Sequence, residues 1–150
     1  MQIATLLHIL GVVVWVGGMF FAYMALRPVA ASVLEPPQRL TLWAGVFGKF
    51  FPWVWVSVAL ILATGLYLLM TMGGAGAPHH ALAMFALGVV MMAIFAHVFF
   101  APYGRLKRAV AAQDWKAGGA ALAQIRQLVG LNLSLGLLTI AVVFLGRALA

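Results

Sequence analysis

Residues 50–104 decide the fold of this chain, and they read FFPWVWVSVALILATGLYLLMTMGGAGAPHHALAMFALGVVMMAIFAHVFFAPYG. No Asp, Glu, Lys or Arg occurs in this stretch. A transmembrane helix needs about 20 consecutive apolar residues to cross the hydrocarbon core of a bilayer. The stretch is long enough for two such helices with a turn between them, so it predicts a membrane protein.

The composition of the whole chain agrees with this prediction. Of its 150 residues, 66% are hydrophobic and 7% are charged, whereas about a quarter of a soluble domain is charged. The net charge is +7, but the basic residues lie in short segments between apolar runs. That pattern is typical of an oriented membrane protein, and it does not indicate nucleic-acid binding. Without cysteine, the chain has neither disulfides nor thiolate metal ligands.

We predict an all-α membrane protein with one domain, a four-helix transmembrane bundle. Lipid offers no hydrogen bonds, so each apolar run must satisfy its own backbone as a helix. The expected spans are residues 3–26, 51–72, 81–100 and 127–149. The first basic residue, Arg27, follows the first run, so we expect a retained helix and no cleaved signal peptide. The expected connections are residues 27–49, with a short interfacial helix at 40–47, then 73–80, and then 101–126, where 115–124 extends the fourth helix.

Lysine and arginine are distributed unequally between the two sides of the membrane. One side holds Arg27, Arg39, Lys49, Arg105, Lys107, Arg108, Lys116 and Arg126, and the other holds only Arg147. Positively charged loops stay in the cytoplasm. The sequence therefore predicts that both termini and the 73–80 turn face outward. In a bacterium this describes a multi-pass inner-membrane protein with both termini in the periplasm.

Two ionisable side chains, His8 and His97, lie inside the predicted spans. Such groups are costly in lipid and are candidates for function. At 1.5 Å per residue across a core of about 30 Å, the two differ in depth by about 15–20 Å. Metal–imidazole bonds are only about 2 Å long. The two histidines therefore cannot bind the same metal ion.

The outer half of the predicted bundle holds further metal-ligand types besides His8. They are His79, His80, Met70, Met72 and Met84. Imidazoles and thioethers without carboxylates favour copper, especially Cu(I), although zinc or haem iron uses the same imidazoles. Methionine also fills gaps in hydrophobic cores, and a histidine pair in a turn is often simply solvated. A buried His8 is harder to explain without a partner.

The first helix carries a face of small residues next to His8. His8, Gly11, Trp15, Gly18 and Ala22 recur at spacings of three and four, so they share one side of a helix. Such a face lets another helix, or a flat ligand, approach closely.

A second polar pair is expected near the charged side. His97 lies at the level of Asn132, and an Asn in a span usually forms a hydrogen bond across helices. We favour a structural His97–Asn132 pair over a second ligand site. No catalytic carboxylate pair is expected, because Glu35 and Asp114 are both loop residues. No phosphate-binding glycine loop or Ser-His-Asp set is visible, so an enzyme is the less favoured interpretation.

Two segments carry a resemblance to a known family. Residues 7–20, LHILGVVVWVGGMF, followed by Leu26-Arg27-Pro28, resemble the first helix of the CopD-type copper-resistance membrane domain. Residues 125–136, IRQLVGLNLSLG, are similar to small bacterial members of that family. The resemblance implies a role in copper handling in the inner membrane. The chain is shorter than the larger members, which favours a homodimer or a subunit of a larger membrane complex.

The first-helix motif is also similar to that of the HemJ-type protoporphyrinogen oxidases, which are small haem-associated membrane proteins. In those, the histidine that His8 matches works with a lysine early in the third helix. The corresponding region here reads Met84-Phe85-Ala86-Leu87, which argues against the oxidase activity. It leaves open haem b, with His79 or His80 as an axial ligand.

Three hypotheses follow from the sequence. The first is copper binding or transport through the outer His/Met site. The second is a haem b protein for electron transfer or oxidation of a small redox substrate. The third is a metal-free accessory subunit, in which all four histidines are dispensable.

Overall fold

The computed structural model describes residues 1–149, and within them every regular element is helical. The elements in chain order are α1 (Gln2–Phe21), the π-helical turn η1 (Ala22–Leu26), α2 (Arg27–Val33), α3 (Pro36–Thr71), the 3-10 turn η2 (Gly74–Gly76), α4 (His79–Phe100), α5 (Pro102–Ala111) and α6 (Trp115–Ala148). Four long helical rods result, and all four are long and apolar enough to cross a membrane. The prediction of an all-helical membrane protein with four spanning helices is confirmed.

The first connection is much shorter than the predicted polar segment 27–49. Helix α1 continues without a break through η1 into α2, and only Leu34 and Glu35 adopt extended conformations before α3 begins. Pro36 lies in the first turn of α3, where a missing N–H costs nothing, whereas Pro28 lies inside the continuous rod, directly after the π-helical turn η1. Residues 40–47, predicted as a separate short helix, are helical but belong to α3.

The second connection is the predicted tight, uncharged turn. Helix α3 ends at Thr71, and Gly73 and Gly74 follow with φ angles of +103° and +60°. Residues other than glycine rarely adopt these backbone angles. Pro78 then caps α4, so the reversal needs fewer than ten residues.

The third connection contains a helix of its own. Ala101 interrupts α4, and Pro102 begins α5, which carries most of the basic residues of this segment. Gln113, with a φ of +56°, completes the reversal. The Asp114 carboxylate accepts a hydrogen bond from the Ala117 N–H at 3.2 Å and caps α6. The predicted extension of the fourth helix over residues 115–124 is confirmed.

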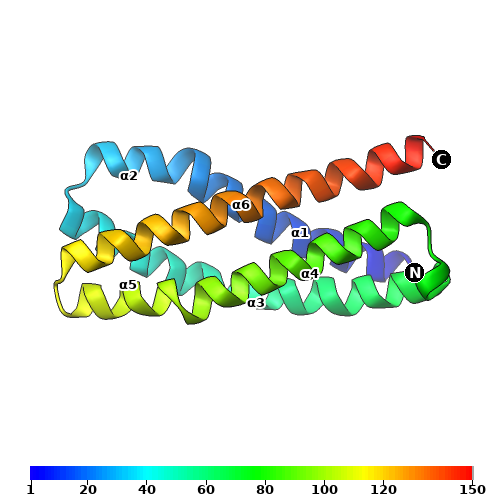
Figure 1. The fold of residues 1–150 in the computed structure, drawn as a ribbon, viewed down its shortest axis with the longest axis horizontal. Coiled ribbons are helices and arrows are strands. Elements are labelled where there is room, and N and C mark those ends of the chain that lie inside the picture. Colours follow the sequence, from blue (N-terminus) through cyan, green and yellow to red (C-terminus); the bar gives the residue numbers. More distant parts are fainter. Residues whose placement is uncertain (150) are drawn as a thin grey trace.

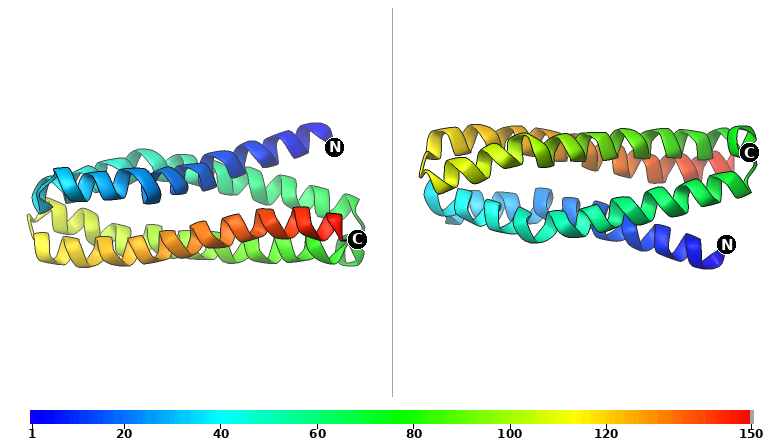
Figure 2. Two further views of the ribbon diagram at one scale, coloured as in Figure 1. Left: turned by 90° about the horizontal axis from the view of Figure 1, so that it is seen from above. Right: turned by 90° about the horizontal axis from the view of Figure 1, so that it is seen from below.

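The rods form an antiparallel bundle in two layers. Helices α1, α2 and α3 make one layer, and α4, α5 and α6 make the other (Figure 2). Both termini lie at the end of the bundle that holds the η2 turn (Figure 1). The rods contain 32 to 36 residues, or about 50 Å of helix at 1.5 Å per residue. Each rod therefore extends well beyond a hydrocarbon core of about 30 Å.

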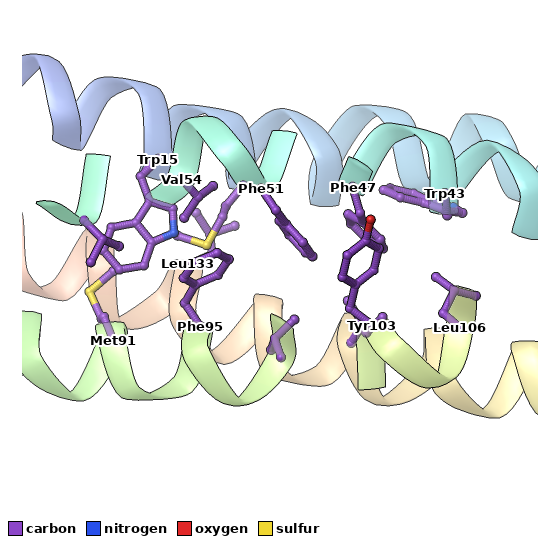
Figure 3. Close-up of a cluster of buried hydrophobic side chains, with 14 of the residues drawn as sticks. Trp15, Trp43, Phe47, Phe51, Val54, Met91, Phe95, Tyr103, Leu106 and Leu133 are labelled. Carbon is purple, nitrogen blue, oxygen red and sulfur yellow. The ribbon is translucent and has the colours of Figure 1, made fainter. Parts of the chain in front are cut away.

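Large aromatic side chains fill the middle and the charged end of the bundle. Phe51 lies at the centre of this cluster, with its ring centroid 4.8 Å from Phe47, 4.9 Å from Tyr103 and 5.4 Å from Phe95. Figure 3 shows these rings meeting between the two layers. Toward the termini, small residues such as Gly11, Ala81 and Gly136 are buried instead. Small residues let helix backbones approach closely where few bulky side chains are present.

Gly146 is a position where this close approach can be tested. A Cβ atom on Gly146 would lie 2.6 Å from the Cβ of His80, so Gly146→Ala must push α4 and α6 apart near the termini. We expect the variant to lose about 1–3 kcal/mol of stability, the usual effect of overpacking. Thermal unfolding in detergent would measure it. Gly119→Ala on the same helix is the matched control, because nothing lies within 4 Å of its added Cβ; equal midpoints for the two variants would contradict the prediction.

Candidate metal site

His8 is held at the contact between α1 and α3. Its Nδ1 lies 3.0 Å from the hydroxyl oxygen of Thr64, which is 8% exposed. The next residue, Gly65, makes room for the ring, because a Cβ there would lie 3.1 Å from the His8 Cε1. Thr64 and Gly65, about two turns before the end of α3, thus hold the imidazole in place.

The hydrogen bonds around Thr64 assign the proton on His8. The Thr64 hydroxyl donates its single proton to the Leu60 carbonyl oxygen one turn earlier in α3. Its oxygen can then only accept a hydrogen bond from His8, so Nδ1 carries the proton. Neutral imidazole in this tautomer keeps its lone pair on Nε2. Metal-binding histidines are typically oriented in this way, with the other ring nitrogen donating to an acceptor.

His79 and His80 occupy the first turn of α4, in the other layer of the bundle. His79 is exposed, and His80 is half-buried against Gly146 of α6. His8 instead contacts α3. His8 and His80 therefore lie at different helix contacts and His79 is exposed, although all three are in the half of the bundle nearer the termini.

The three methionines of the predicted set also lie in that half of the bundle. Met70 and Met72 are 66% and 49% exposed at the end of α3, and Met84 is half-buried one turn into α4. Met70 and Met72 come six and eight residues after Thr64, which is about 9–12 Å along the helix axis. These thioethers are placed near the end of the bundle, and His8 is placed deeper.

Within residues 1–149, no three His, Asp or Glu side chains are grouped so that they could share a metal ion. A single centre built from His8, His79 and His80 is therefore not formed. The physical reason is that His8 packs against α3 in one layer, His80 packs against α6 in the other, and His79 is exposed. The candidate ligand side chains are spread along the half of the bundle nearer the termini instead of meeting in one three-histidine site.

The predicted His97–Asn132 pair is wrong. Asn132 is 3% exposed, and its Nδ2 donates to the Met91 carbonyl oxygen at 3.1 Å. His97 is exposed on α4. Asn132 therefore packs α6 against α4 at a position nearly two turns before His97. Its Oδ1 is buried and has no hydrogen-bond partner among the described residues.

Helix α3 covers the small-residue face of α1 at Gly11 and Gly18. A Cβ on Gly11 would lie 2.9 Å from Ile61, and one on Gly18 would lie 2.3 Å from the Phe50 ring. Trp15, on the same face, is 3% exposed and packs edge-on against Phe95. In Figure 3 the Trp15 ring lies beside Met91 and Phe95 in the core. These residues pack helices together, and Trp15 has a structural role.

An apolar cavity of about 270 Å³ lies in the core beside Trp15, Phe51 and Asn132. No imidazole or carboxylate lines it. Met19 is the only lining residue of a soft metal-ligand type, and a single thioether does not make a copper or haem-iron site, so the candidate metal ligands remain those nearer the termini.

Comparison with known protein families identifies the chain. Residues 44–145, more than half of its length, match the family described as copper resistance protein D. The chain belongs to the copper resistance protein D (CopD) family. It is a copper-resistance-related integral membrane protein, as the CopD resemblance predicted. Searches of curated proteins and of solved structures found no match.

The CopD match has a boundary that matters for the site. It includes residues 125–136, one of the two segments that carried the resemblance, and it includes Thr64 and the Met70–Met84 region. It begins after the first helix, so His8 lies outside it. The CopD match therefore covers Thr64 and Gly65 on α3 but does not extend to His8.

Sequence reasoning missed Thr64 as the partner of His8. The available signal was the adjacent Thr64 and Gly65 within the apolar stretch of α3. A polar residue next to a small one in a span marks a face that contacts another helix. The sequence did not show which helix would meet that face.

Proposed function

We propose that this CopD-family protein binds Cu(I) within the membrane, with His8 as the deeper ligand, and passes it between soft ligands at successive depths. The observation that carries the proposal is a pair of successive hydrogen bonds, from His8 Nδ1 to the Thr64 hydroxyl and from that hydroxyl to the Leu60 carbonyl oxygen. These hydrogen bonds orient the neutral imidazole so that the lone pair of Nε2 is available to a metal, and an imidazole nitrogen of this kind suits Cu(I). The family supports copper as the metal.

Capture of the ion is assigned to the side chains near the termini. His79, Met70 and Met72 are exposed there, and each offers one soft donor. His80 is half-buried beside His79, and Met84 is half-buried about one turn further into α4. Ligands spread over several turns suit transfer, because an ion that moves must bind each site weakly enough to leave it. With the positively charged loops in the cytoplasm of a bacterium, the capture end faces the periplasm.

The test is a Cu(I) titration of the detergent-purified protein against a competing chelator. We expect one Cu(I) bound per chain. We further expect Thr64→Val to weaken binding by about 10–100-fold, the usual effect of losing a hydrogen bond that orients a metal ligand. Thr64→Ser keeps the hydroxyl and should bind like the wild type.

Two results would overturn the proposal. One is equal Cu(I) affinity of the wild type and Thr64→Val. The other is a visible spectrum of the purified protein with a Soret band that sharpens on dithionite reduction, together with α and β bands. That spectrum would establish haem b as the cofactor in place of copper. A protein that binds neither Cu(I) nor haem would be assigned to the accessory-subunit hypothesis.

A further inference from the structure

A pocket of about 330 Å³ lies at the charged end of the bundle, far from the candidate metal ligands. Its walls come from both layers: the η1–α2 segment and the start of α3 on one side, and the first half of α6 on the other. Three arginines line it, Arg27, Arg39 and Arg126. Neither of the two acidic residues of the chain, Glu35 and Asp114, is among the lining residues.

The three guanidinium groups retain most of their hydrogen-bonding capacity. Arg27 uses its Nε–H on the Tyr23 carbonyl oxygen at 3.2 Å and lies 4.4 Å above the Tyr23 ring. Arg39 makes one long contact, 3.5 Å, to the Ala31 carbonyl oxygen. A guanidinium group has five N–H donors in a fixed fork that matches phosphate oxygens. Three such groups without a carboxylate form a site for an anion.

The positions of Arg27 and Arg126 in the sequence place the pocket at the membrane surface. Arg27 directly follows the apolar run of the first rod, and Arg126 directly precedes the apolar run of the fourth. Each is therefore the first cation met on leaving the hydrocarbon core. Lipid phosphates lie at this level, and basic pockets between transmembrane helices recognise anionic headgroups there.

The remaining walls suit an amphiphile better than a free ion. Trp43 and Trp115 line the pocket, and amphipathic aromatic rings favour the headgroup level. Leu40, Phe47 and Val129 make up an apolar part of the wall. A small soluble anion would make no favourable contact with this apolar surface, whereas the glycerol and upper acyl groups of a phospholipid would pack against it.

We propose that this pocket binds the phosphate group of an anionic phospholipid, held by Arg27, Arg39 and Arg126. The occupied site joins the two layers at the charged end of the bundle, because Arg27 and Arg39 belong to one layer and Arg126 to the other. The bound lipid is a structural ligand that is independent of copper.

Native mass spectrometry of the detergent-purified full chain would test the proposal, with dioleoyl phosphatidylglycerol and dioleoyl phosphatidylcholine as probes. We expect the wild type to bind phosphatidylglycerol more tightly. The double variant Arg27→Gln/Arg126→Gln should weaken phosphatidylglycerol binding by about tenfold or more, since each basic residue at the surface contributes severalfold. The variant Arg27→Lys/Arg126→Lys, which keeps the charge, should recover part of the loss.

The matched control is Arg108→Gln/Lys116→Gln. It removes the same charge from the same end of the chain, and neither residue lines the pocket. The control should bind phosphatidylglycerol like the wild type. An equal loss in the control would overturn the proposal, because it would show a general effect of surface charge. Displacement of the lipid by millimolar inorganic phosphate would also overturn it, in favour of a free-phosphate site.

Discussion

Replacing His8 with alanine is expected to weaken Cu(I) binding by more than about 100-fold, because the loss of a ligand should exceed the 10–100-fold effect of losing the group that orients it. The imidazole is positioned before any metal arrives: Thr64 accepts from Nδ1, and Gly65 leaves space for the ring. Alanine supplies no donor atom in its place. The measurement is a Cu(I) titration against a chelator of known affinity, with detergent-purified protein.

The same variant separates binding from folding. Hydrogen bonds between transmembrane helices contribute only about 0.6 kcal/mol on average. His8→Ala should therefore unfold at nearly the same temperature as the wild type while binding Cu(I) far more weakly. His97→Ala is the control, because His97 is exposed and lies outside the proposed ligand set. Unchanged affinity in His8→Ala, or an equal loss in His97→Ala, would refute the role of His8.

Replacing Phe51 with alanine is expected to cause the largest loss of stability, about 3–5 kcal/mol, the usual effect of truncating a buried phenylalanine. Phe51 is 3% exposed and contacts aromatic rings from both layers, including Phe47 on its own helix and Phe95 and Tyr103 across the bundle. It also borders the core cavity, which its removal would enlarge. The two layers would lose their main contact near the middle of the bundle.

The measurement is the free energy of unfolding from SDS titration in mixed micelles. Phe144→Ala is the matched control, because Phe144 is 69% exposed on the apolar part of α6. Lipid and detergent tails are as apolar as a side chain, so truncating Phe144 should have little effect. A similar loss in the two variants would show that the aromatic cluster does not hold the layers together.

The sequence alone determined the class of the protein and the number of its spans. Four apolar runs, separated by charged or glycine-rich segments, leave no other solution in lipid than four helices. The chain from Gly73 to Pro78 also had to be a turn, because it combines glycines with a proline. The helices of the structure extend beyond the predicted spans. A run of apolar residues marks only the part of a helix that lies in the hydrocarbon core. The helices α2, α3, α5 and α6 include polar residues beyond these runs.

Only the tertiary structure decided which side chains meet. His8 contacts Thr64, Asn132 contacts Met91, and three arginines distant in sequence share one pocket. The physical reason lies in the solvent. A helix in water shows its packed face as an apolar stripe, but a helix in lipid is apolar on every side, so its sequence does not mark the face that contacts another helix. The choice of partners then depends on the fit of small residues and single hydrogen bonds, and these exist only once the helices are packed.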